Sequence, residues 1–141
     1  MSVTVVTHIN LRGNARQALE FYQSVFGGQI AIVTYGDAGN VQDPSDANHI
    51  MWGQVDSDNG FRVMAYDVPV AMPWNPGEIP FFVLVRGEDG AKITGYWKKL
   101  CEGSTIIRQL EPAGWATLYG MVKDRFGVTW VLDVVAPYNA N

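Results

Sequence analysis

The chain has 141 residues, of which 48% are hydrophobic, and this is enough for one domain with its own core. Its formal net charge is −4 and no stretch concentrates lysine and arginine, so the sequence predicts neither a nucleic-acid partner nor a membrane partner. The single cysteine, Cys101, rules out a disulfide within the chain. Because no secretory signal pattern opens the sequence, we expect a cytoplasmic protein.

The first half of the chain predicts one helix among four strands. Asn14 suits the N-cap of this helix, since its side-chain oxygen can accept a hydrogen bond from a backbone N–H one turn further on. Leu19, Tyr22 and Phe26 then recur on one helical face, and two glycines follow as a stop. Alternating β-branched and aromatic residues predict strands at residues 3–11, 29–35, 49–55 and 61–67. The predicted order is βαβββ.

The second half predicts the same order after a proline-rich segment. Residues 68–80 hold four of the seven prolines and are predicted to be a linker. Asp89 is expected to cap a helix that reaches about Cys101, and Gly103 ends it. Strands are predicted at residues 81–86, 105–110, 117–122 and 128–134.

The two halves are related as copies of one unit. An offset of 75 residues aligns Tyr22 with Trp97 in the two helices, and an offset of 66 aligns Asp67 with Asp133 at the ends of two strands. A repeat of this length predicts two supersecondary modules that share one domain. The predicted boundaries are about 1–68 for the first module, 69–79 for the linker and about 80–137 for the second module.

Several short segments, in this order and spacing, resemble the vicinal oxygen chelate superfamily, and its PhnB-like branch in particular. They are residues 13–15, 18–22, 26–28, 63–67, Trp115 with Tyr119 and Gly120, and 124–130. The superfamily includes glyoxalase I, extradiol dioxygenases, fosfomycin-resistance enzymes and bleomycin-resistance proteins. The resemblance implies an α+β fold in which two βαβββ modules form an open curled barrel around a cavity. It also implies a homodimer.

The same resemblance implies four positions for metal ligands, one on the first strand and one on the last strand of each module. In this sequence they fall on Thr7, Ala65, Phe82 and Val131, and none of these is a useful ligand for a transition metal. If Gly13 lengthens the turn before the first helix, the first of them moves to an equally unsuitable valine. We therefore predict no metal and no other cofactor.

The alternation of side chains along the first strand predicts which of its residues contact the ligand. His8, Asn10 and Arg12 alternate with Ile9 and Leu11. Burying the three polar side chains under a helix without partners would be costly, so we expect them to face the cavity. His8 is the best acid–base candidate, because histidine titrates near neutral pH.

Two tryptophans and two aspartates complete the predicted site. Trp52 and Trp74 could stack on a planar or cationic ligand, although most aromatic residues, and Cys101 with them, are expected in the core. Asp67 and Asp133 could face each other near the mouth of the cavity, or each could cap the end of its strand.

The sequence thus predicts a metal-free protein that binds a small molecule in its cavity, in the manner of bleomycin-resistance proteins. One alternative is a lyase, isomerase or dioxygenase-like enzyme that uses His8 with a carboxylate or an atypical metal site. A second is an interaction subunit with a vestigial cavity. A methyltransferase is not expected, because the Gly-rich loop of a nucleotide-binding fold is missing from the sequence.

Overall fold

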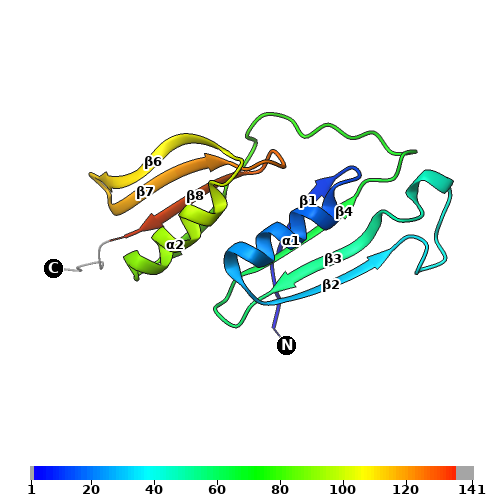
Figure 1. Ribbon diagram of the computed structural model, residues 1–141, viewed down its shortest axis with the longest axis horizontal. Helices are drawn as coiled ribbons and strands as arrows, with labels where there is room; N and C mark the ends of the chain where they lie inside the picture. Colours follow the sequence, from blue (N-terminus) through cyan, green and yellow to red (C-terminus); the bar gives the residue numbers. More distant parts are fainter. Residues whose placement is uncertain (1, 136–141) are drawn as a thin grey trace. The chain divides into compact units, whose positions relative to one another are not determined.

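The computed structural model describes residues 2–135. Its contacts group into two compact units, residues 1–76 (module 1) and residues from 77 onward (module 2), and each is described by itself below. Both modules have the order βαβββ, and Figure 1 shows one helix beside a sheet in each. In residues 2–135, no helix is long and apolar enough to cross a membrane.

Module 1 packs a single helix on a four-stranded mixed sheet. The sheet has the strand order β1-β4-β3-β2, with β1 parallel to β4 and the other pairs antiparallel. Helix α1 covers one face of this sheet through a buried stripe that includes Leu19, Tyr22 and Val25. The elements are β1 (Thr7–Leu11), α1 (Ala15–Phe26), β2 (Gln29–Thr34), a short 3-10 helix (Pro44–Asp46), β3 (Ile50–Asp56) and β4 (Arg62–Asp67).

Module 2 repeats this arrangement. Its sheet has the order β5-β8-β7-β6, again with one parallel pair, β5 with β8. Helix α2 packs through Ile93, Trp97 and Leu100. The elements are β5 (Val83–Gly87), α2 (Gly90–Leu100), β6 (Thr105–Ala113), β7 (Ala116–Lys123) and β8 (Thr129–Val134). The predicted α+β fold of two βαβββ modules is therefore confirmed; residues 136–137 at the predicted end of the second module lie outside the described residues.

The strand pairing corrects the predicted offset between the later strands. The hairpin that joins β3 to β4 ends in the pair Asp56–Arg62, and its counterpart ends in Lys123–Thr129, so the offset is 67 and the predicted 66 is wrong by one. Two glycines, Gly53 and Gly120, support the new value, because each lies on β3 or β7 directly under a side chain of the module's helix. Since side chains alternate between sheet faces, a slip of one residue reverses every face assignment.

The two helices begin in different ways. Asp89 caps α2 as predicted, because its carboxylate accepts hydrogen bonds from the backbone N–H groups of Ala91 and Lys92. Asn14 holds the N-cap position of α1, but its side chain makes no capping hydrogen bond. Asp67, at the end of β4, takes over this function by accepting from the N–H groups of Gly13 and Ala15. The local cap predicted for α1 is thus replaced by a carboxylate from another strand.

Candidate functional site

The candidate site lies on the open face of module 1, defined here as the face of its sheet that α1 does not cover. Ile9 and Leu11 are buried, at 5% and 3% exposure, while His8 and Asn10 are exposed. Alternation along β1 therefore places the two apolar side chains under α1 and the two polar ones on the open face. This confirms the face assignment predicted for β1.

His8 is held by its neighbours on the open face. Its Nδ1 lies 2.9 Å from Oδ1 of Asn10, and its ring meets Tyr66 edge to face, with the centroids 5.2 Å apart. Because an amide oxygen only accepts hydrogen bonds, the imidazole Nδ1 is the donor of this pair. Nε2 carries a lone pair whenever the ring is neutral, and residues 2–135 offer it no hydrogen-bond partner.

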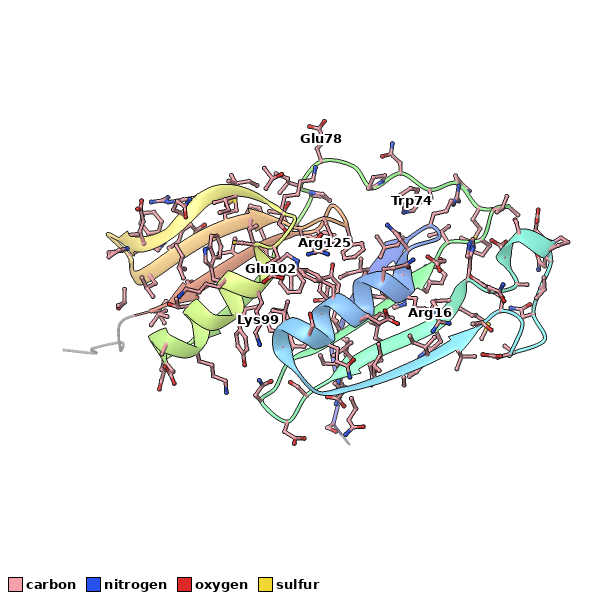
Figure 2. All side chains as sticks on the ribbon, in the orientation of Figure 1. Arg16, Trp74, Glu78, Lys99, Glu102 and Arg125 are labelled. Atoms are coloured by element: carbon pink, nitrogen blue, oxygen red, sulfur yellow. The ribbon has the colours of Figure 1, made fainter. Side chains whose placement is uncertain are left out.

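Arg12 and Trp74 bring the start of the linker onto the same end of module 1. The indole Nε1–H of Trp74 donates to the backbone carbonyl of Asn10 at 3.0 Å. The Arg12 guanidinium donates to the carbonyls of Pro69 and Met72 and lies 5.8 Å from the Trp74 ring centroid. Figure 2 shows Trp74 projecting from the linker. Sequence reasoning selected both residues but did not foresee that Arg12 binds linker carbonyls.

Trp52 belongs to the same face, further across the sheet. It precedes Gln54 by two residues on β3, so the two side chains share a face. Gln54 is the cross-strand partner of Met64, and Met64 is the partner of His8, so all four lie on the open face. The Trp52 side chain is 38% exposed, so part of its ring surface is accessible. The open face therefore combines aromatic surface from Trp52 and Tyr66 with the polar groups of His8 and Asn10.

The two predicted aspartates have other partners. Asp67 is 2% exposed and lies on the helix-covered face, where it also accepts from the N–H of Ile50 at 2.8 Å. Asp133 is 2% exposed too, but it lies on the uncovered face of its own sheet and forms a bidentate pair with Arg86 at 2.9 and 3.0 Å. The pair raises the pKa of the Arg86 guanidinium above its usual value. These contacts favour structural roles, and ligand binding by either carboxylate stays a prediction.

The four positions for metal ligands carry no suitable donors in the observed register. In module 2 the two ligand positions are still Phe82 and Val131. The strand pairing makes Val6 and Met64 their equivalents in module 1. Three of these side chains cannot coordinate a metal, and a thioether is a soft ligand that suits few metals. Within residues 2–135, no cluster of three His, Cys, Asp or Glu side chains is arranged to hold a metal ion. The residues present therefore do not fit the metal of the superfamily.

Sequence reasoning missed a second polar and aromatic cluster, on module 2. Trp115 was expected in the core with most other aromatic residues, yet it is 61% exposed. Arg108 lies against it and against Tyr119. Trp115 lies in the two-residue turn between β6 and β7, where a side chain has no sheet face to pack on. The sequence predicted a longer connection there, between strands at residues 105–110 and 117–122, and so missed this turn. Cys101 is partly buried, and this burial raises the pKa of its thiol to about 11.

Comparisons with known proteins agree with this architecture. A family model described as 3-demethylubiquinone-9 3-methyltransferase matches residues 3–133. Protein PA1353 from Pseudomonas aeruginosa is 28% identical, with a TM-score of 0.82 over 95% of this chain and 98% of that one. No curated protein matches.

Two further structures show the same fold at lower identity. A putative 3-demethylubiquinone-9 3-methyltransferase, PhnB protein, from Bacillus cereus is 21% identical, with a TM-score of 0.71 over 94% of this chain and 100% of that one. A glyoxylase/bleomycin resistance protein/dioxygenase domain from Frankia sp. is 7% identical, with a TM-score of 0.68 over 96% and 99%. The chain therefore belongs to the family whose model is described as 3-demethylubiquinone-9 3-methyltransferase.

Proposed function

We propose that this protein binds a small organic molecule on the open face of module 1, without a metal. The observation that carries the proposal is the convergence of His8, Asn10 and Trp74, which hydrogen bonds join at 2.9 and 3.0 Å. A binding surface needs apolar area together with a few polar groups in fixed positions. Here the polar groups are held by neighbouring side chains before any ligand arrives, which lowers the entropic cost of binding.

Charge and hydrogen bonding narrow the class of ligand. Module 1 contains three basic and seven acidic residues and no lysine, so its field favours a cationic or neutral ligand. The His8 Nε2 lone pair accepts a hydrogen bond, and the rings of Trp52 and Tyr66 offer surfaces for stacking. We therefore propose a planar, neutral or cationic molecule that carries at least one hydrogen-bond donor.

An enzyme remains the second candidate, and the accessible Nε2 of His8 favours it. A base at this position could abstract a proton from a bound substrate. A dyad with Asp67 receives no support, because Asp67 lies on the opposite face of the sheet and accepts three backbone hydrogen bonds there. We do not propose methyl transfer despite the family's name, because the sequence lacks the Gly-rich loop of a nucleotide-binding fold and the sheets are mixed.

A thermal-shift screen tests the binding proposal. The protein is screened against a library of planar cationic, neutral and anionic metabolites, and each hit is titrated by calorimetry. We expect the hits to come from the cationic and neutral members. His8→Ala should weaken binding about tenfold, the usual cost of losing one well-placed polar contact in a binding site. Trp74→Phe should weaken binding by a similar factor, about tenfold, because it removes the hydrogen bond that holds Trp74 to the Asn10 carbonyl.

The matched control is Glu20→Gln, which changes a charge on the exposed side of α1 and so leaves the open face intact. Its affinity for each hit should stay within about twofold of the wild type. Equal losses of affinity in His8→Ala, Trp74→Phe and Glu20→Gln would contradict the binding proposal. A library without hits would contradict it as well. Turnover of a bound hit that disappears in His8→Ala would favour the enzyme.

We also propose a homodimer and a cytoplasmic location. Exposed apolar side chains on module 2, among them Phe82 and Leu84 at 45% and 49% exposure, support an association surface. The single cysteine supports a reducing compartment. Light scattering on Leu84→Asp and on the wild type checks the dimer, and a monomeric wild type would contradict it.

A further inference from the structure

Module 2 contains a second cluster that the proposed function does not use. The Arg108 guanidinium carbon lies 5.1 Å from the centroid of the Trp115 ring and 5.2 Å from that of Tyr119. The two rings meet edge to face, with their centroids 5.3 Å apart. One arginine therefore contacts two aromatic rings that are themselves in contact.

The fold explains why these three residues meet. Gly120 faces α2, because a side chain there would meet the Trp97 ring at 2.9 Å. Its neighbour Tyr119 therefore projects from the other face of the sheet. Irregular pairing between β6 and β7 sets Arg108 opposite Met121, which shares that face with Tyr119. Trp115 lies in the two-residue turn between these strands.

Arg108 has aromatic contacts but no anionic partner in the part of the chain that the structure describes, residues 2–135. Glu111 is the cross-strand partner of Tyr119, yet no ion pair or hydrogen bond joins it to Arg108. The other exposed arginine of this sheet, Arg86, differs, because Asp133 occupies its donors. Stacking on the rings orients the Arg108 guanidinium and leaves the N–H groups along its edge available.

We propose that Arg108, Trp115 and Tyr119 form a binding element for an oxyanion carried on an aromatic ring. The edge of the guanidinium takes the carboxylate or phosphate in a two-point contact, and the exposed surface of Trp115 stacks on the ring. Module 2 contains seven basic and seven acidic residues, so its net charge does not repel an anion. The element takes a different class of ligand from the site proposed on module 1, which favours neutral or cationic ligands.

An NMR titration of the full chain tests this proposal with three probes of one shape. They are 2-naphthoate, 2-naphthyl phosphate and the neutral 2-naphthamide. The readout is the indole N–H signal of Trp115, which is assigned by its loss in Trp115→Phe. We expect saturable shifts with at least one of the two anions and none with the amide. The stronger of the two anions identifies the source of the oxyanion, carboxylate or phosphate.

Variants on the same face separate this element from a general attraction for anions. Arg108→Gln should weaken binding of the better anion about tenfold or more, because a charge-assisted pair of hydrogen bonds is lost. Lys123→Gln removes an equal charge from the same strand face, and Lys123 contacts no ring within residues 2–135. The affinity of this variant for the anion should change less than about twofold.

Each remaining outcome overturns the proposal. These outcomes are equal binding of the amide, equal effects of Arg108→Gln and Lys123→Gln, and an indole signal that no probe shifts. Because Arg108 is exposed, its replacement should leave the rest of the spectrum in place, and this confirms that the variant is folded. Failure here leaves the site on module 1 unaffected, since its ligands and variants are different.

Discussion

Module 1 and module 2 have the same order and pairing of elements but carry different side chains on their uncovered sheet faces. Their strand pairing agrees residue for residue at an offset of 67 along the last two strands, and each places a glycine under its helix. Their helix starts, charges and uncovered sheet faces differ. The comparison indicates that backbone register and close helix packing are what the two modules share. The side chains that could bind ligands are particular to each module.

The largest expected difference concerns the helix starts. Asp67 accepts hydrogen bonds from three backbone N–H groups, those of Gly13, Ala15 and Ile50, whereas Asp89 accepts two within its own turn. Asp67→Ala should lower the free energy of unfolding by about 3–5 kcal/mol, because three donors lose their acceptor at once. Asp89→Ala should cost only about 1 kcal/mol, the usual cost of losing an exposed N-cap. Urea titration of both variants measures the difference, and equal losses would show that the two caps are equivalent.

The next prediction tests the close packing of helix on sheet that the two modules share. A side chain at Gly53 would come within 2.4 Å of Leu19 and 3.0 Å of a backbone carbonyl, and one at Gly120 would come within 2.9 Å of the Trp97 ring. Gly53→Ala and Gly120→Ala should therefore each cost about 1–3 kcal/mol through overpacking between helix and sheet. The exposed Gly95→Ala on α2 is the control and should be neutral or stabilising, because nothing lies within 4 Å of the added atom. Loss of stability in only one module would contradict the shared packing.

A smaller effect depends on pH and concerns module 1 alone. Tyr35 is 5% exposed and donates to the backbone carbonyl of Asp67 at 2.7 Å, and its burial raises its pKa to about 12. Tyr35→Phe should cost about 1 kcal/mol at pH 7 through the lost hydrogen bond. Above pH 10 the unfolded tyrosine ionises before the folded one, so the wild type loses stability that the variant keeps. The difference in free energy of unfolding between the wild type and Tyr35→Phe, measured by urea titration, should therefore narrow as the pH rises above 10. A difference that does not change with pH would place the tyrosine in an ordinary environment.

The sequence was sufficient for the order and type of the elements, because periodic apolar residues and glycine stops mark each helix and strand locally. It also predicted the faces of β1, since burying His8 and Asn10 under α1 would leave polar groups without partners. It failed by one residue in relating β4 to β8, because Trp130, Val131 and Leu132 are consecutive apolar residues and because Asp133 coincides with Asp67 at an offset of 66. Only hydrogen bonding between strands separates the two offsets.

The site was harder to predict because its contacts come from residues far apart in the sequence. His8 and Asn10 were selected together from the first strand and Trp74 on separate grounds, but the hydrogen bond from Trp74 to Asn10 spans 64 residues and has no local signal. The cap that Asp67 provides for α1 is equally distant, so Asn14 looked sufficient on its own. Trp115 was not singled out, because most aromatic residues were expected in the core, whereas its place in a tight turn exposes it.

The proposal that module 1 carries the ligand site is tested most directly by following indole N–H signals during titration with the strongest hit of the thermal-shift screen. We predict saturable shifts for Trp74 and Trp52, which lie on module 1, and an unchanged signal for Trp130, which is fully buried in module 2. Shifts confined to module 2, or an unchanged Trp74 signal at saturating ligand, would contradict the proposal.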